Sequence, residues 1–167
     1  MSKRHAFVGL GSNLGEREAA LRTARERLAQ AGLEPLRASG LYWTEPVGGP
    51  PQEWFLNQVV LGLTELSPEA LLEACLAVER QAGRVRGLKD GPRTLDLDLL
   101  AYEGERRDLK HLQLPHPRLH ERRFVLVPLC EIAAHDLLTG TQRTFAQLLA
   151  DCPDRSAVEP FDAVSAR

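Results

Sequence analysis

The sequence predicts a single α+β domain in which two β–α–β units share one antiparallel sheet. Three observations support this fold class. Two amphipathic segments each follow an apolar segment, as crossover helices do. The second and third apolar segments succeed one another with no helix between them, which does not suit a purely parallel sheet. The chain has 167 residues, a length that suits one core rather than two.

The first unit begins close to the N-terminus. Residues 5–10 (HAFVGL) predict a short buried strand that ends at Gly11. Residues 16–31 predict a helix, because apolar residues recur there at helical spacing among charged ones, and Gly32 is placed to end it. Residues 36–43 predict a weaker strand. The recurring apolar residues of the helix are Leu21, Ala24, Leu28 and Ala31.

The second unit follows a loop rich in proline and glycine at 44–51. Residues 55–63 predict a strand. The triplet SPE at 67–69 predicts a helix start, because serine caps, proline suits the first turn and glutamate favours the positive end of the helix dipole. That helix runs to about Ala82, and residues 94–102 (TLDLDLLAY) alternate as a strand does. This order predicts a ferredoxin-like βαββαβ sandwich with both helices on one face of the sheet.

The rest of the chain forms an extension to the sandwich rather than a second domain. From about Asp108 it is rich in loops, with a short helical stretch near 122–133. Residues 151–167 show little periodicity, and we expect this tail to be partly disordered. The whole of 1–167 is therefore treated as one domain.

Composition and charge restrict the class of partner. The 21 basic and 23 acidic residues give a formal net charge of -2, so no overall field favours nucleic acid or an anionic membrane. The three cysteines are widely spaced without a CxxC pair, which argues against a disulfide framework or zinc site and fits a reducing compartment. No segment resembles a signal peptide or approaches the ~18 apolar residues of a membrane span. We expect a soluble, cytoplasmic monomer.

The most specific chemical feature is the pair Asp96 and Asp98 in the strand predicted at 94–102. Alternate side chains of a strand share a face, so both aspartates point away from the leucines around them. Their Cα atoms would lie roughly 6.5–7 Å apart, close enough for both carboxylates to reach the same cations. Such oxygen ligands suit Mg²⁺, which commonly takes one or two carboxylates, phosphates and water. A solvated polar strand face is the alternative interpretation.

Two basic segments bracket this pair, and the first of them is rich in glycine. A polyphosphate needs cations bridging its oxygens and guanidinium groups that fork onto them. Either basic segment alone could be a solubilising surface, but the acidic pair between them favours a polyphosphate site. The upstream residues are Arg80, Arg84, Arg86, Lys89 and Arg93, and the downstream ones are His116, Arg118, His120, Arg122 and Arg123.

Two other segments leave alternatives open. GLGSNLG at 9–15 is one residue too long for the dinucleotide-binding GxGxxG, so we interpret its glycines as a tight strand-to-helix turn. Asn57 is in phase with Phe55 and Leu61 on an otherwise apolar strand face, and a buried amide must be hydrogen-bonded. Backbone groups could satisfy it. It could instead read the edge of a flat heterocycle stacked on Phe55 or Phe124.

Several motifs, in order along 5–133, match one known family. They are GLGSNLG at 9–15, YWTEPVG at 42–48, FLNQVV at 55–60, GRVR at 83–86, GPRTLDLDLL at 91–100 and LPHPRLHERRFVLVPL at 114–129. The last two together are highly specific, whereas GLGSNLG alone is weak. With these motifs the chain resembles the 6-hydroxymethyl-7,8-dihydropterin pyrophosphokinases of folate biosynthesis.

The resemblance implies ATP and Mg²⁺ as requirements, and transfer of the β,γ-diphosphate of ATP to the pterin's hydroxymethyl oxygen with release of AMP. It implies that Asp96 and Asp98 bind two Mg²⁺ ions and that Arg84 and Arg93 are also catalytic. The pterin-binding residues that it implies are Thr44, Pro46, Val47, Gly48, Phe55, Asn57 and Phe124. The ATP-binding residues that it implies are Leu72, Glu79, Arg84, Arg86, Arg93, Leu99, His116 and Arg122.

The chain departs from the family's pattern at two places. Asp90 stands where many relatives carry a tryptophan, and Pro117 stands where some carry a tyrosine. Two rival functions share parts of the pattern: an RNA-binding domain of the same fold, and another DxD metal enzyme such as a nucleotidyltransferase or nuclease. An RNA-binding sheet would carry exposed aromatic and basic side chains, where this chain has aspartates.

Overall fold

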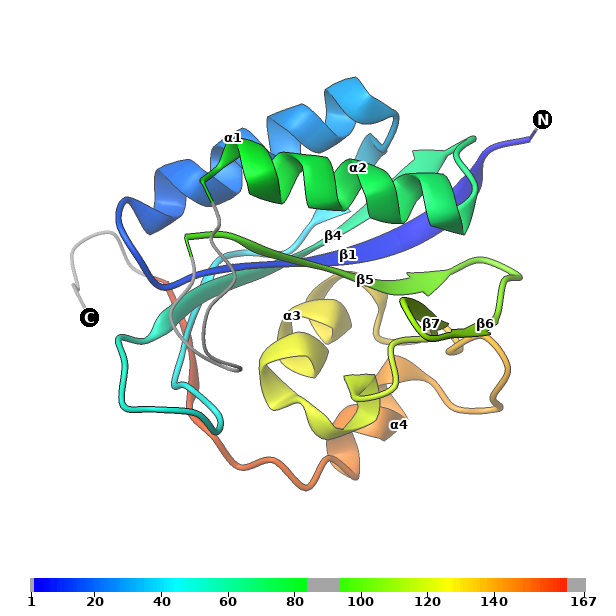
Figure 1. Ribbon diagram of the computed structural model, residues 1–167. Coiled ribbons are helices and arrows are strands. Elements are labelled where there is room, and N and C mark those ends of the chain that lie inside the picture. Colours follow the sequence, from blue (N-terminus) through cyan, green and yellow to red (C-terminus); the bar gives the residue numbers. More distant parts are fainter. Residues whose placement is uncertain (1, 84–93, 162–167) are drawn as a thin grey trace.

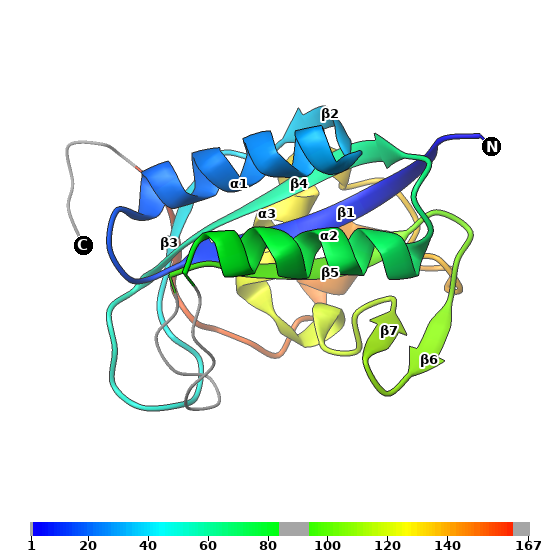
Figure 2. The same cartoon turned by 45° about the horizontal axis from the view of Figure 1, so that its top comes forward.

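Figure 1 shows the computed structural model of the chain, which describes residues 2–83 and 94–161. A sheet lies between two layers of helices, with α1 and α2 on one face and α3 and α4 on the other (Figures 1 and 2). None of the helices in the described parts is long and apolar enough to cross a membrane. The elements are β1 (Arg4–Ser12), α1 (Arg17–Ala31), β2 (Glu34–Ala38), β3 (Tyr42–Thr44), β4 (Phe55–Thr64), α2 (Pro68–Gln81), β5 (Asp96–Tyr102), β6 (Arg107–Leu109), β7 (Leu112–Leu114), a 3₁₀ turn (Leu119–Glu121), α3 (Arg123–Ala133), α4 (Phe145–Ala150) and β8 (Val158–Pro160).

The main sheet has the strand order β5-β1-β4-β3-β8, and β2 also pairs with β4. Every pairing in it is antiparallel, with β1 between β4 and β5. This is the βαββαβ arrangement that the sequence predicts, so the ferredoxin-like fold class is confirmed.

Local signals set the helix ends as predicted. The Ser67 hydroxyl accepts a hydrogen bond from the Ala70 N–H at 3.1 Å, which caps α2. Helix α1 ends at Gly32, whose φ of 121° suits a residue without a Cβ. The other apolar residues predicted for the buried face of α1 are buried, but Ala31 is exposed because the helix ends there.

The strand predicted at 36–43 is instead two short strands, β2 and β3. Ser39, between them, is buried. Its N–H donates to the Val59 carbonyl at 2.9 Å, while its hydroxyl oxygen accepts the Val59 N–H at 3.0 Å. The side chain of Ser39 thus replaces a backbone carbonyl in the ladder, and regular pairing is interrupted.

Each face of the sheet packs into its own hydrophobic core. Alternate residues such as Val8 and Leu10 pack against α1 and α2. Phe7, on the other face, meets Phe145 of α4 edge-on with ring centroids 5.5 Å apart. The sequence predicts helices on one face only; the C-terminal extension covers the second face because that face is also apolar.

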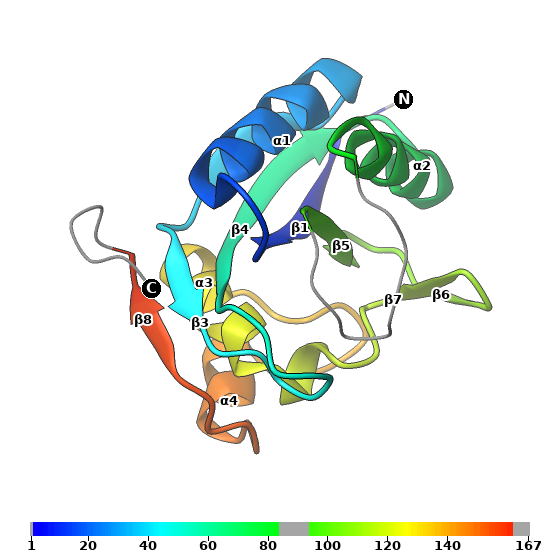
Figure 3. The ribbon, with the colours of Figure 1, turned by 60° about the vertical axis from the view of Figure 1, so that its left-hand side comes forward.

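Part of the C-terminal tail is built into the sheet. Strand β8 lies beside β3, where Trp43 pairs with Glu159 (Figure 3). The Phe161 ring lies 5.6 Å from the Trp43 ring between centroids. Such a long-range pairing cannot be read from three residues of sequence. Residues 162–167 lie outside the described residues, and disorder there stays a prediction.

Candidate active site

A row of three residues crosses the sheet on the face that carries α3. Gly11 of β1 pairs with Asn57 of β4 on one side and with Asp96 of β5 on the other. Neighbouring strands lie ~4.8 Å apart, so the backbones of Asn57 and Asp96 are separated by about 9.5 Å. The Asn57 amide and the Asp96 carboxylate therefore lie on the same face of the sheet, on opposite sides of Gly11.

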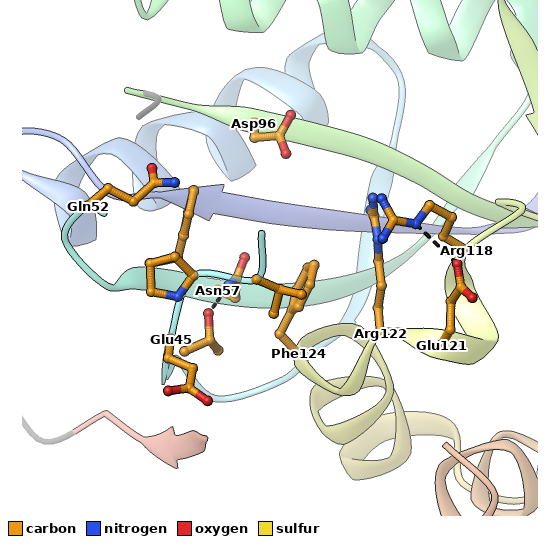
Figure 4. Close-up of a pocket in the computed structure, with 12 residues that line it drawn as sticks. Glu45, Gln52, Asn57, Asp96, Arg118, Glu121, Arg122 and Phe124 are labelled. Carbon is orange, nitrogen blue, oxygen red and sulfur yellow. Dashed lines mark hydrogen bonds and ion pairs between the residues drawn. The ribbon is translucent and has the colours of Figure 1, made fainter. Parts of the chain in front are cut away.

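A pocket lies between the sheet, the β3–β4 loop and the start of α3 (Figure 4). It brings together most of the residues predicted to bind a pterin, along with one of the two predicted metal ligands. The lining residues are Thr44, Glu45, Pro46, Val47, Gln52, Phe55, Asn57, Asp96, Arg118, Glu121, Arg122 and Phe124.

The Asn57 amide is held in place by Thr44. Its Nδ2 donates to the Thr44 hydroxyl oxygen at 2.6 Å, and Thr44 is buried. The sequence left open that backbone groups satisfy this amide, but the partner of Nδ2 is a side-chain hydroxyl. Phe55 and Phe124 line the same pocket, so a ligand there would meet aromatic rings together with the acceptor and donors of a side-chain amide.

Asp96 and Asp98 project from the face of β5 opposite Leu97 and Leu99, as predicted. Both are half-buried, and the Arg122 Nη1 atom lies 3.8 Å from the Asp98 Oδ2 atom. The backbone between them is fixed from the other side, because the buried Glu79 carboxylate accepts the Leu97 N–H at 2.7 Å. The two carboxylates are thus carried on a well-anchored strand.

The two carboxylates fit a cation that arrives with a polyphosphate. No cluster of three or more histidine, cysteine, aspartate or glutamate side chains in the described ranges could hold a metal on its own. Mg²⁺ needs no such cluster, since one or two carboxylates suffice when phosphates and water complete its shell. The donor set is therefore of the kind that binds magnesium together with its substrate.

His116 enters the site region as a neutral ring. Burial, with the nearby Arg122 and Arg118 cations, lowers the pKa of His116 to about 4, although Asp96 acts in the opposite sense. Its Nδ1 atom accepts the Arg118 N–H at 3.1 Å, so the neutral ring carries its proton on Nε2. It can donate a hydrogen bond to a phosphate oxygen at neutral pH but adds no charge.

The remaining predicted residues are placed elsewhere. Gly48 follows Val47 in the β3–β4 loop and is exposed, with a φ of 71°. Leu72 and Glu79 lie on α2, and Leu99 is buried in the core that α2 covers, so the structure does not bring these three to the pocket. Arg84, Arg86 and Arg93 lie outside the described residues.

The β3–β4 loop is held by residues that were not predicted from the sequence. Asn13 is buried, and its Nδ2 donates to the Gln52 Oε1 atom at 2.8 Å and to the Glu53 carbonyl at 3.0 Å. Arg17 donates to the Trp54 carbonyl at 2.8 Å. The end of the loop is therefore pinned to the β1–α1 turn. GLGSNLG carried this signal, but Gly9 and Gly11 lie within β1, so assigning them to the turn was wrong; only Gly15, with a φ of 69°, fits that role.

The tail ties two walls of the pocket together. The Asp154 carboxylate accepts the Arg123 N–H at 3.0 Å, at the start of α3. The Ala157 N–H donates to the Glu45 carboxylate at 2.9 Å, and the Glu45 N–H donates to the Ala157 carbonyl at 3.2 Å. One short segment thus contacts both the helix and the loop that border the pocket.

The family model described as 7,8-dihydro-6-hydroxymethylpterin-pyrophosphokinase matches residues 7–134. The chain belongs to this family. It is 47% identical over 155 residues to the 2-amino-4-hydroxy-6-hydroxymethyldihydropteridine pyrophosphokinase of Methylorubrum extorquens, an alignment that covers 92% of this chain and 96% of that one. It is 45% identical over 128 residues to the protein of the same name from Bacillus subtilis, covering 76% and 77% of the two chains.

Solved structures agree on the fold of this pyrophosphokinase-family chain. One is the wild-type HPPK-DHPS of Plasmodium falciparum with pterin and p-hydroxybenzoate, which superposes with a TM-score of 0.69 at 14% identity. The match covers 89% of this chain and 43% of that one. The family model ends at 134, so the tail that ties the pocket walls lies beyond the part that it matches.

Proposed function

We propose that this pocket binds 6-hydroxymethyl-7,8-dihydropterin against Asn57 and presents its hydroxymethyl oxygen to magnesium-bound ATP at Asp96 and Asp98. The chain, as a member of this family, is a pyrophosphokinase of folate biosynthesis. The observation that carries the assignment of residues is the cross-strand row, in which the Asn57 amide and the Asp96 carboxylate face one pocket from either side of Gly11.

In the proposed reaction the pterin hydroxyl oxygen attacks the β-phosphorus in line. The new bond joins that oxygen to the β-phosphorus, and the bond from the β-phosphorus to the bridging oxygen of the α-phosphate breaks. AMP leaves with the electron pair, and the hydroxyl proton passes to water. Two Mg²⁺ ions, when bound, supply neutralisation of the phosphate charge and lower the pKa of the attacking alcohol. No residue is assigned as a general base.

The protein's side chains orient the pterin ring and neutralise the charge of the triphosphate. Asn57 holds the edge of the ring through its acceptor and donor, while Phe55 and Phe124 stack on its faces. Arg122, which lies against Asp98, exchanges that contact for phosphate oxygens when the nucleotide binds. His116 donates from Nε2 to the triphosphate without adding charge. Positioning of this kind is the main source of catalysis in phosphoryl transfer.

The ATP-binding roles of Arg84, Arg86 and Arg93, and those of Leu72, Glu79 and Leu99, are also part of the proposal. Arg84 and Arg93 neutralise the triphosphate and exclude water from it. Glu79 contributes by anchoring the strand that carries the metal pair. A monomeric state and a cytoplasmic location complete the proposal.

The test is an assay of nucleotide products. Purified protein is incubated with ATP and Mg²⁺, with and without 6-hydroxymethyl-7,8-dihydropterin, and AMP and ADP are quantified. AMP that depends on the pterin is expected. ADP would indicate transfer of a single phosphate, and the absence of both from folded protein would refute the proposed reaction.

The two rival functions are less well supported. The sheet face that an RNA-binding domain would use is partly covered by α3 and α4, and its open part carries the aspartate pair. A nucleotidyltransferase or nuclease would share the metal pair but gives no reason for an amide in a pocket that Phe55 and Phe124 also line. Its product would be pyrophosphate or cleaved nucleic acid rather than AMP.

A further inference from the structure

Gly11 occupies the centre of the cross-strand row. Alternation along β1 turns Val8 and Leu10 toward α1 and α2, so Gly11 lies on the other face, between Asn57 and Asp96. The backbone of Gly11 therefore lies in the sheet between the amide and the carboxylate, both of which line the pocket. This is the stretch of sheet that a flat ring must cross to reach from one to the other.

A side chain at this position would collide with the recognition amide. A Cβ built on Gly11 would lie 2.5 Å from the Asn57 Oδ1 atom and 3.6 Å from its Cγ, and the next contact would be with Phe55 Cδ1 at 3.8 Å. To reach ordinary van der Waals separation the Oδ1 atom must move by about 1 Å. The amide cannot make that move and keep its 2.6 Å hydrogen bond to Thr44 in the same geometry.

The collision involves the end of one side chain and no backbone atom. Asn57 can rotate away into the pocket, so the sheet itself is not strained. A methyl group at Gly11 is therefore expected to leave the fold intact while it misplaces the amide. A substitution at Gly11 should therefore change ligand binding without changing the stability of the fold.

We propose that Gly11 is a specificity-determining residue for the pterin, acting through Asn57. Its lack of a side chain lets the Asn57 Oδ1 atom lie over β1, where it can meet the edge of the ring. This inference rests on the proposed function, because it takes the ligand of the pocket to be the reduced pterin.

Two other glycines provide matched comparisons. Gly9 lies on the same strand and face, but its added Cβ would meet Leu100 Cδ1 at 3.5 Å, an ordinary contact. Gly62 of β4 is the opposite case, because its Cβ would lie 2.6 Å from Leu33 and 2.9 Å from the Glu34 carbonyl oxygen, which belongs to the backbone. The same substitution is thus expected to be neutral at Gly9 and to damage the fold at Gly62.

The experiment compares Gly11→Ala and Gly9→Ala with the wild-type chain. Affinity for 6-hydroxymethyl-7,8-dihydropterin is measured by calorimetry with Mg²⁺ and a non-hydrolysable ATP analogue, and KM and kcat are measured for each substrate. Gly11→Ala should weaken pterin binding about ten- to a hundredfold, the effect of losing hydrogen bonds to a desolvated group. Its affinity for the ATP analogue and its urea midpoint should match the wild type, and Gly9→Ala should match it in all respects.

A double-mutant cycle with Asn57→Ala tests whether Gly11 acts through the amide. In the Asn57→Ala background the collision partner is gone, so Gly11→Ala should cause no further loss. Three results would overturn the inference: unchanged pterin affinity in Gly11→Ala, an equal loss in both backgrounds, or a urea midpoint lowered as far as in Gly62→Ala. If the wild-type chain itself bound no pterin and made no AMP, the proposed function would fail and this inference with it.

Discussion

Replacement of Asp154 by alanine should loosen the start of α3 and, with it, one wall of the pocket. The Asp154 carboxylate accepts the Arg123 N–H at 3.0 Å and the Ser156 N–H at 2.9 Å, and it also bonds the Ser156 hydroxyl. Arg122, the residue just before helix α3, makes no side-chain cap, so Asp154 supplies one from the tail. Burial acts to raise the pKa of Asp154, but the hydrogen bonds from Ser156 and Arg123 outweigh it and leave that pKa below its ordinary value of 3.8.

The magnitude follows from these contacts. Loss of a helix cap costs about 1 kcal/mol, and loss of the turn bonds within the tail costs a similar amount, so the free energy of unfolding should fall by about 2 kcal/mol. For a domain of this length that is roughly 4–8 °C in Tm. Because Arg122 and Phe124 flank the capped residue and line the pocket, KM for the pterin should rise more than kcat falls.

The assay is urea unfolding followed by circular dichroism, with steady-state kinetics on the same preparations. Asp151→Ala is the matched control: its side chain is 70% exposed and its partner is the surface residue Arg143, so it should cost less than about 0.5 kcal/mol. The depressed pKa of Asp154 contributes stability that is present above pH 3.8 and lost as pH falls through the lower folded value. Equal stability of the two variants, or a pterin KM in Asp154→Ala equal to that of the wild type, would refute this account of the tail.

Four other outcomes can be checked. Asp98→Ala should lower AMP formation at least about a hundredfold with an unchanged circular dichroism spectrum, as loss of charge stabilisation predicts; near-normal activity would remove the metal assignment. Glu79→Ala should lower the free energy of unfolding by about 1.5–3 kcal/mol, because the Leu97 N–H loses a charged acceptor. Glu79→Gln should lose much less stability, and equal losses in the two variants would contradict the anchoring role. With EDTA present, the free energy of unfolding should decline as pH falls from 6.5 toward 4. In this range His116 takes up a proton in the unfolded chain but not in the folded one, where its pKa is lowered to about 4. His116→Gln should flatten that part of the curve of urea midpoint against pH. Burial first, then Glu79 and Asp98, raise the pKa of Cys75 to about 12. At pH 8 this thiol should therefore resist alkylation until the chain unfolds, and rapid labelling of the native protein would show that Cys75 is accessible to solvent.

Much of the site could be predicted from local sequence because its residues sit on regular strands. Alternation alone placed Asp96 and Asp98 on one face of β5, and the phase of Asn57 marked it as an amide on an apolar face. The Thr44 partner of that amide could not be predicted, because it depends on the pairing of β3 with β4. Asn13 stands in the GLGSNLG motif, but its role as an anchor of the loop could not be predicted, because its partners Gln52 and Glu53 lie far along the chain.

Three features can be read from local sequence alone: the strand and helix periods, the start of α2 at its serine cap, and the side of β5 on which the carboxylates lie. These are local properties, set by periods of two and 3.6 residues and by single capping side chains. Contacts between distant segments set three others: Gly11 separates Asn57 from Asp96, α3 covers the second face of the sheet, and the tail contacts two walls of the pocket. Those arrangements depend on strand register and on hydrogen bonds between distant segments, and a shift of one residue in register would turn every side chain of a strand to the opposite face.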